Sequence, residues 1–254
     1  MSQNPIIQYG KKIYHRLIPD HVLYKNVRLP AKYLRYCGSR FKDDERYLDS
    51  ALNEADRLVN VLNVTKNSVV LDVGCGVGRL AIGLTQKLPG IKDYQGIDVS
   101  ENAIRWCKKN ISSGFPNFHF SKIDMKNELY NKEGREVTSL IPLPFKSEEF
   151  DIIYLYSVFS HMRSKDVSYY LEEFRRIIKR DGKIFMTAFL EEGVPDEEEN
   201  PANYRMEWTV PLHCVRYNKK FFESLTGKAG FRIDRFDYEN ETDGQSGIYL
   251  SVQE

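Results

Sequence analysis

A glycine-rich loop between an apolar run and a helical pattern is the feature that most constrains the fold of this chain. The β-branched run 69–73 predicts a buried strand, and Gly74, Gly76 and Gly78 follow it. Leucines then recur every four residues over 80–88, which predicts a helix. Glycine permits positive φ angles and a close approach of backbone to ligand. The pattern therefore predicts a strand, a ligand-binding turn and a helix N-terminus in that order.

The spacing of the loop and two carboxylates narrow the ligand class. A dinucleotide-binding loop reads Gly-x-Gly-x-x-Gly, and its third glycine would fall on Arg79. Asp72 precedes the loop and suits an ammonium group better than a pyrophosphate. Asp98 ends the next expected strand, where a carboxylate can accept both hydroxyls of a ribose. The sequence predicts a ligand with a ribose and a cationic end, and it disfavours an NAD-dependent oxidoreductase.

Strand and helix patterns alternate along most of the chain. Strands are expected at 69–73, 94–97, 118–123, 151–156, 184–189, 231–236 and 248–252, and helices at about 43–62, 80–88, 167–180 and 218–229. The Asp181–Gly182 pair is expected to end the third of these helices. Ser100 can cap a further helix, whose first turn holds Glu101. Such alternation predicts a parallel sheet with right-handed crossovers and helices on both faces. Ligands then bind beyond the carboxyl ends of the strands.

Two segments fall outside this alternation. Residues 1–45 are rich in proline and aromatic side chains and are expected to form an arm or lid, which leaves 46–254 as the main domain. Residues 190–217 interrupt the pattern as an insertion that is expected to cap the substrate. Aromatic residues make up 13% of the chain and are frequent in both segments. These segments are the expected lids.

The motifs resemble those of class I S-adenosylmethionine-dependent methyltransferases, over about 43–252. The matching segments are 69–84 (motif I), 96–100 (the acidic second motif), 123–125, 151–162 and 177–184. The last resembles an "LKPGG" turn, although Arg180 and Asp181 replace its Pro and Gly. The resemblance implies an α/β, Rossmann-like, doubly wound, seven-stranded, mostly parallel sheet with an antiparallel last strand, and a small-molecule methyltransferase of the type 11/12/25-like group.

The resemblance also implies the cofactor, S-adenosyl-L-methionine, with S-adenosyl-L-homocysteine as product. Asp72 and the glycine loop would contact the methionine moiety, Asp98 the ribose, and Asp124 with Met125 the adenine. The candidate cofactor residues are Asp72, Gly74, Cys75, Gly76, Gly78, Arg79, Asp98, Val99, Asp124, Met125, Tyr156 and Ser157. For two of them a plain structural role stays open, because Asp98 could cap the next helix and Asp124 could form a turn.

His161 is the candidate catalytic residue. It lies in a segment after the fourth strand that resembles the "SVFTHL" segment of bacterial methyltransferases. His161 could act as a base, position the substrate, or only fix the loop. The candidate substrate residues are Tyr33, Tyr36, Arg40, Phe159, Trp208, His213 and Tyr217. Phe159 could instead be core, the arm aromatics could only pack the arm, and His119 is expected to be buried in its strand.

Charge and cysteine usage limit the partners. Lys and Arg number 37 against 36 Asp and Glu, a net charge of +1 that argues against a nucleic-acid binder held by charge alone. The four cysteines lack metal-ligand spacing, so no metal is expected. The uncharged run 152–162 is too short to cross a bilayer, and no secretory signal is visible, so no membrane association and a cytoplasmic location are expected.

The position after the fourth strand also limits the chemistry. Methylation of exocyclic base amines commonly uses an Asn/Asp-Pro-Pro-aromatic loop there, and this chain reads Tyr-Ser-Val-Phe at 156–159. The sequence therefore predicts metal-independent O-methylation of a small molecule, either a sugar or a secondary metabolite. Two alternatives stay open: a protein or RNA methyltransferase, and a non-catalytic cofactor-binding partner subunit. The oligomeric state, monomer or homodimer, is not indicated.

Overall fold

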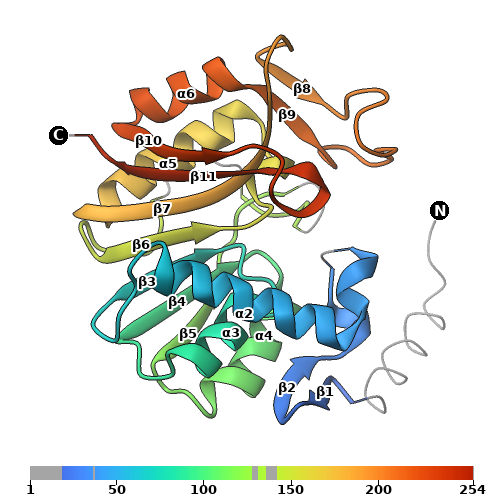
Figure 1. The fold of residues 1–254 in the computed structure, drawn as a ribbon, viewed down its shortest axis with the longest axis vertical. Helices are drawn as coiled ribbons and strands as arrows, with labels where there is room; N and C mark the ends of the chain where they lie inside the picture. Colours follow the sequence, from blue (N-terminus) through green and yellow to red (C-terminus); the bar gives the residue numbers. More distant parts are fainter. Residues whose placement is uncertain (1–18, 37, 128–130, 136–141, 254) are drawn as a thin grey trace.

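A mostly parallel sheet forms the centre of the protein (Figure 1). The computed structural model describes residues 19–36, 38–127, 131–135 and 142–253. The main strands are β3 (Val69–Val73), β4 (Asp93–Asp98), β5 (Phe118–Lys122), β6 (Phe150–Leu155), β7 (Ile178–Glu191), β10 (Phe231–Asp237) and β11 (Ser246–Val252). Their order is β10-β11-β7-β6-β3-β4-β5, with β11 antiparallel to β7 and β10. The predicted fold class, including the antiparallel last strand, is confirmed.

The strand order reverses between β3 and β6. From β3 the chain adds β4 and β5 on one side, and it then returns to add β6 and β7 on the other. A short antiparallel pair, β8 (Glu197–Glu199) and β9 (Val215–Asn218), continues the sheet beside the end of β7. The carboxyl ends of β3 and β6 therefore form the switch point at which sheets of this kind bind ligands.

Helices cover both faces of the sheet (Figure 1). On one face lie α2 (Asp44–Asn60), α3 (Arg79–Lys87) and α4 (Glu101–Cys107), which the π-helical turn η3 (Lys108–Ser112) continues; on the other lie α5 (Ser164–Ile177) and α6 (Lys219–Lys228). Successive residues of β3 enter the two cores in turn, with Val70 in one and Leu71 in the other. This double burial explains the continuous apolar run that predicted the strand.

The caps of the helices follow from their sequences. Asp43 accepts a hydrogen bond from the Arg46 amide, Ser100 accepts one from Ala103, and Asn218 caps α6. Side-chain oxygens at these positions satisfy amides that the helix leaves free. The observed bounds of α2, α3 and α6 lie close to the predicted ones.

The predicted end of the third helix is wrong. Helix α5 ends at Ile177, and β7 begins at the next residue, so Asp181 and Gly182 lie inside a strand. The pairing of β7 with β6 shifts in register between Phe150 and Ile152. A Cβ on Gly182 would lie 2.5 Å from Ile178 Cγ1. Gly182 therefore permits a close approach within a strand and does not stop a helix.

The described part of the N-terminal segment packs on the sheet's helices. It contains a hairpin, β1 (His21–Tyr24) and β2 (Val27–Pro30), and two 3-10 turns, η1 (Lys32–Leu34) and η2 (Ser39–Lys42). Trp106 Nε1 donates to the Asp20 carbonyl at 2.7 Å. Arg35, which is 1% exposed, donates to the Pro30 and Phe41 carbonyls. The segment lies at the carboxyl edge of the sheet, as does the β8–β9 insertion (Figure 1).

In the described ranges, no helix has the length and apolar content to span a bilayer.

Candidate active site

The glycine loop adopts the left-handed backbone that its sequence predicts. Gly74, Gly76 and Gly78 have φ angles of 73°, 51° and 72°. A Cβ on Gly74 would lie 2.5 Å from Val158 Cγ2, so the loop packs directly against the segment that follows β6. Helix α3 begins at Arg79, and its free N-terminal amides lie next to the loop. The loop therefore needs glycine both for its backbone angles and for its contact with the β6 exit.

Asp98 joins the end of β4 to this loop. Its Oδ2 accepts a hydrogen bond from the Gly76 amide at 2.8 Å, and its Oδ1 accepts one from the Ser100 amide at 2.7 Å. Burial raises the pKa of the Asp98 carboxyl, and the two amide bonds oppose that rise. Ser100, not Asp98, caps helix α4. Each carboxylate oxygen keeps a lone pair for a further donor such as a ribose hydroxyl.

Asp72 lies beneath the loop on the α2 side of the sheet. It is 4% exposed, and its Oδ2 accepts a hydrogen bond from the Tyr94 hydroxyl. Burial raises the pKa of Asp72 to about 7, and the Tyr94 bond opposes this. The Asp72 carboxyl is therefore expected to ionise near pH 7, and a nearby cationic group would favour its ionised form.

Cys75 and Cys107 form the apolar support of the loop. Both are buried free thiols, and both sulfurs lie near the Gly76 carbonyl oxygen, at 3.7 Å and 3.5 Å. Burial raises the pKa of the Cys75 thiol well above its ordinary value. Such thiols are unreactive and pack as small apolar groups.

The expected adenine end of the site is more open. The Asp124 side chain is 52% exposed and lies 3.5 Å from Arg135 Nε, whereas Met125 is 5% exposed. Val99 is half-buried and packs on the α5 core. The Ile123 amide donates to the Asp98 carbonyl, which brings the end of β5 beside Asp98.

Arg79 contacts side chains away from the glycine loop. Its guanidinium donates to Ser50 Oγ at 2.6 Å and pairs with Glu54 Oε1 at 2.7 Å, both on α2. It also lies over the rings of Phe41 and Tyr156. The structure therefore places the cofactor candidates Arg79 and Tyr156 in contact with each other.

The segment after β6 holds a strained residue. Ser157 has a φ of 57°, in the left-handed region that side chains other than glycine seldom adopt. Its amide donates to Thr187 Oγ1 at 2.8 Å, and its hydroxyl accepts from Gln245 Nε2 at 2.9 Å. Such strain persists where surrounding bonds enforce it, and it commonly marks functional sites.

His161 is held in one tautomer. Its Nδ1 lies 3.2 Å from the Leu212 carbonyl oxygen, which can only accept, so this nitrogen carries the proton and Nε2 keeps its lone pair. Burial lowers the pKa of His161, and the Leu212 bond opposes this. The imidazole is thus neutral near pH 7. It borders a cavity of about 350 Å³ that Asn127, Glu199 and Leu212 also line.

Two substrate candidates from the insertion lie near His161. The His161 and His213 rings stack with centroids 6.5 Å apart, and Trp208 meets His213 edge-on at 5.2 Å. His213 Nδ1 is buried and has no hydrogen-bond partner among the described residues. The Tyr217 hydroxyl donates to the Met162 carbonyl, which ties the insertion to the end of η4 (Phe159–His161).

The other substrate candidates belong to the α5 core or to the N-terminal segment. Phe159 is fully buried and stacks on Phe174, so it belongs to the α5 core. Tyr33, Tyr36 and Arg40 lie exposed on the N-terminal segment.

The predicted burial of His119 is wrong. Its side chain is 53% exposed and lies 3.5 Å from Asp93. Its neighbours Phe118 and Phe120 both enter the α2–α4 core, so alternation along the strand directs His119 to the opposite face. Because β5 is the edge strand, that face is open there.

The site also contains polar residues that no motif indicated. Glu54, Arg57 and Glu241 form a buried ionic cluster beneath the β6 exit, in which Arg57 Nη2 pairs with Glu241 Oε1 at 2.5 Å. One signal was present in the sequence, since Glu54 falls between Ala51 and Ala55 on the apolar face of its helix. A charged residue at such a position indicates a buried partner.

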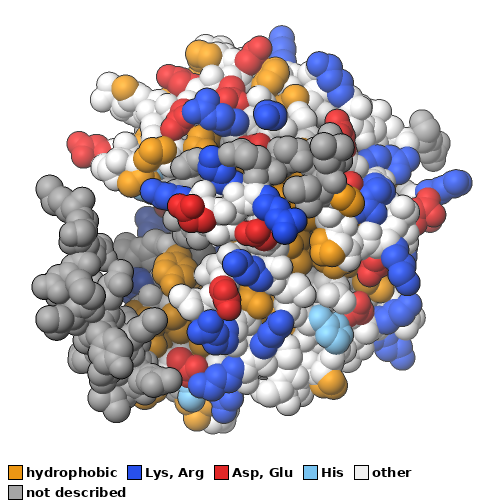
Figure 2. Space-filling view, turned by 180° about the vertical axis from the view of Figure 1, so that it is seen from behind, with side chains coloured by type: hydrophobic (Ala, Val, Ile, Leu, Met, Phe, Trp, Pro, Cys, Tyr) orange, Lys and Arg blue, Asp and Glu red, His pale blue; other side chains and the backbone are white. Residues whose placement is uncertain are grey.

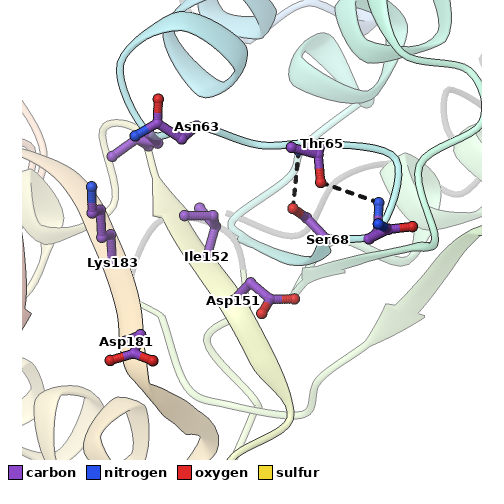
Figure 3. Close-up of a pocket in the computed structure, with 9 residues that line it drawn as sticks. Asn63, Thr65, Ser68, Asp151, Ile152, Asp181 and Lys183 are labelled. Carbon is purple, nitrogen blue, oxygen red and sulfur yellow. Dashed lines mark hydrogen bonds between the residues drawn. The ribbon is translucent and has the colours of Figure 1, made fainter.

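A second cavity of about 320 Å³ lies at the opposite edge of the sheet (Figure 3). It is lined by Ser68, Asp151 and Lys183, at the amino ends of the parallel strands. Its loop is held by a bond from the Thr65 amide to Ser68 Oγ at 3.0 Å. Because ligands of such sheets bind at the carboxyl ends, this cavity is separate from the candidate site.

Comparison with known families decides the assignment. A family model described as a methyltransferase domain matches residues 64–240. The chain belongs to this methyltransferase family. The predicted relationship to S-adenosylmethionine-dependent methyltransferases is confirmed.

Curated relatives match over part of their length. An uncharacterized protein of Methanocaldococcus jannaschii is 43% identical over 68 residues, 27% of this chain and 30% of the relative. The methyltransferase GfsG of Streptomyces halstedii is 24% identical, over 72% of this chain and 62% of the relative. A demethylmenaquinone methyltransferase of Bacillus velezensis is 24% identical, over 51% and 48%. The chain thus spans less than two thirds of these relatives.

Solved structures share the fold. A SAM-dependent methyltransferase from Aquifex aeolicus superposes with a TM-score of 0.56 at 18% identity, over 83% of this chain and 94% of the other. Magnesium protoporphyrin IX methyltransferase from Synechocystis with bound SAM gives 0.56 at 16% identity, over 88% and 90%. At these identities the likeness concerns the fold.

Proposed function

We propose that this methyltransferase uses S-adenosyl-L-methionine to methylate a hydroxyl of a small molecule, without a metal ion. The observation that carries the proposal is the Asp98 carboxylate, bonded to the glycine-loop amide of Gly76 at 2.8 Å. This hydrogen bond places a carboxylate that can accept ribose hydroxyls next to a glycine backbone that a ligand can approach closely. Both lie at the switch point between β3 and β6. The cofactor itself has family support, since the chain falls within a methyltransferase family.

The cofactor residues would divide the ligand among them. Asp98 would accept the two ribose hydroxyls. Asp72, poised near neutrality, would favour the cationic amino group of the methionine moiety. Met125 would give the adenine an apolar surface beside Asp124.

His161 is the proposed base. The bound cofactor supplies an activated methyl group, so the protein's task is to align the acceptor and to take its proton. His161 Nε2 is free for that proton because Nδ1 donates to the Leu212 carbonyl. As the acceptor oxygen attacks the methyl carbon in line, its proton passes to Nε2 and the sulfur leaves as a neutral thioether.

The two extra segments are the proposed lids. The described residues before 46 (19–36 and 38–45) and the 190–217 insertion both lie at the carboxyl edge of the sheet, where closure would exclude water (Figure 1). The domain from 46 to 254 would carry the chemistry. His213 and Trp208 would line the acceptor side, next to His161.

The charge distribution supports a small acceptor. On the face shown in Figure 2, Lys and Arg are interspersed with Asp and Glu and form no continuous basic surface outside the grey atoms. The described residues contain no group of three or more His, Cys, Asp or Glu side chains placed to hold a metal. The relatives include methyltransferases of quinones and the methyltransferase GfsG. We propose a phenol, sugar or related metabolite as acceptor, and a cytoplasmic enzyme.

Transfer of a labelled methyl group to a cell extract tests this function. We expect the label in products that pass a membrane retaining macromolecules, and we expect His161→Ala to cut transfer by about 100-fold or more while cofactor affinity changes little. Label in protein or RNA would instead support a macromolecular substrate. No label, with S-adenosylhomocysteine still bound, would indicate a non-catalytic partner subunit. Equal transfer by His161→Ala would refute its role as base.

A further inference from the structure

Arg79, the residue after the glycine loop, lies against two aromatic rings. Its Cζ lies 4.7 Å from the ring centroid of Phe41 and 4.5 Å from that of Tyr156. Its amino groups are held on α2, by Glu54 at 2.7 Å and Ser50 at 2.6 Å. We call Phe41, Glu54, Arg79 and Tyr156 the Arg79 clamp. It combines two contacts between the guanidinium and aromatic rings with an ion pair.

The clamp is buried, which makes a purely stabilising role a poor explanation. Arg79 is 8% exposed and Glu54 is 5% exposed. Burial raises the pKa of Glu54, and the charge of Arg79 opposes that rise. Desolvation of two such charges largely cancels their attraction, so apolar residues of similar size would stabilise the fold at least as well. What the ion pair adds is a fixed direction for the guanidinium.

Each part of the clamp belongs to a different segment around the site. Arg79 directly follows Gly78 of the cofactor loop and opens α3. Phe41 lies in η2 of the N-terminal segment, and Tyr156 follows the last residue of β6. The guanidinium therefore contacts one ring of an expected lid and one ring at the β6 exit.

Tyr156 extends the connection to a third segment. Its hydroxyl lies 2.8 Å from Thr242 Oγ1, donates to Glu241 Oε2 at 3.2 Å and accepts from the Thr242 amide at 3.1 Å. Thr242 begins η5 (Thr242–Gly244), the connection between β10 and β11. Glu241 is in turn held by Arg57 of α2. The β10–β11 connection is thus bonded to the same clamp.

We propose that Arg79 is a positioning residue that couples cofactor binding at the glycine loop to the order of the N-terminal segment and the β10–β11 connection. Movement of the loop on binding shifts the first turn of α3, and the contacts of Arg79 with the Phe41 and Tyr156 rings transmit that shift. Arginine suits this role because its planar cation presents two faces to rings while its edge donates hydrogen bonds, and lysine cannot do both. The inference rests on the proposed function for the identity of the ligand.

Hydrogen exchange of the full chain, with and without S-adenosylhomocysteine, tests the coupling. In the wild type we expect the ligand to slow amide exchange in 38–48 and 238–246. Phe41→Leu removes one of the two ring contacts of Arg79 and leaves the glycine loop unchanged. The ligand should therefore still bind, with a Kd within about threefold of the wild type, but it should no longer slow amide exchange in 38–48. Phe41→Tyr keeps the ring and should restore the effect. Arg79→Lys should lose it in both segments.

Lys87→Gln is the matched control. Lys87 also joins α3 to α2, through Asp56 at 2.9 Å, but at the far end of α3 and in an exposed pair. It should keep the wild-type response. The inference is overturned if the ligand binds the wild type without slowing exchange in these segments, or if Phe41→Leu keeps the full response. If Arg79→Lys fails to fold, the Phe41 pair decides. Absence of any ligand binding to the wild type, measured by titration calorimetry, would instead overturn the proposed function.

Discussion

Replacement of Asp98 by alanine removes the proposed ribose acceptor. The carboxylate already accepts the Gly76 and Ser100 amides at 2.8 Å and 2.7 Å, which fixes its orientation toward the loop. Two ribose hydroxyls would add two hydrogen bonds to a charged group, each contributing about 1.5–3 kcal/mol. The variant should therefore bind S-adenosylhomocysteine at least about 100-fold more weakly, since 1.4 kcal/mol is a factor of ten.

Titration calorimetry measures this loss. Glu101→Gln is the matched control, because it removes an exposed carboxylate at the start of the next helix whose partner is Arg105. Its affinity should equal that of the wild type. A 2′,3′-dideoxy analogue of the ligand separates contact from support of the loop: removal of the hydroxyls should weaken binding to the wild type and should matter little in Asp98→Ala.

Two results would refute the ribose assignment. One is an affinity of Asp98→Ala within about threefold of the wild type in a folded protein, because even one charged hydrogen bond exceeds that. The other is an equal loss with the dideoxy analogue in both proteins. In that case Asp98 would serve only to hold the glycine loop.

The remaining predictions concern pH and packing. Burial raises the pKa of Asp72 from 3.8 to about 7, so the folded state disfavours its ionisation and the free energy of unfolding should fall as the pH rises from about 4 to about 7. Asp72→Asn should make this fall shallower in urea titrations at several pH values. An equal dependence of the unfolding free energy on pH in both proteins would contradict this. Methyl transfer should stay constant from pH 7 to pH 8 and decline in more acidic buffer as His161, whose pKa burial lowers, is protonated; a decline already complete at pH 7 would argue against it as base. Gly83→Ala should destabilise the fold by about 2–3 kcal/mol in thermal unfolding, because its Cβ would lie 1.9 Å from the Ala51 carbonyl oxygen. Gly227→Ala has nothing within 4 Å of its Cβ and should be neutral or stabilising. Equal effects of the two substitutions would contradict the close packing of α3 on α2 at Gly83.

The parts of the site that lie close together in sequence were predictable. The glycine loop and the carboxylates at the ends of β3 and β4 are local signals, because backbone angles and strand ends are set by neighbouring residues. The same holds for the caps Asp43 and Ser100, whose side chains bond to amides within three residues. Local sequence patterns thus indicate a candidate ligand site.

The parts that depend on distant partners were not predictable. Arg79 matched a loop position by motif, yet its partner Ser50 lies 29 residues away, and Arg57 and Glu241 are 184 residues apart. The exposure of His119 follows from β5 being the edge strand, which only the strand order reveals. The direct passage from α5 into β7 depends on pairing with β6, which no local turn signal indicates.

Titration of the wild-type chain with S-adenosylhomocysteine tests the central claim most directly. The account predicts saturable binding of one ligand per chain, and competition by S-adenosylmethionine at the same site. Absence of binding at ligand concentrations up to about 1 mM, equivalent to about −4 kcal/mol, would contradict the assignment of the glycine loop as a cofactor site.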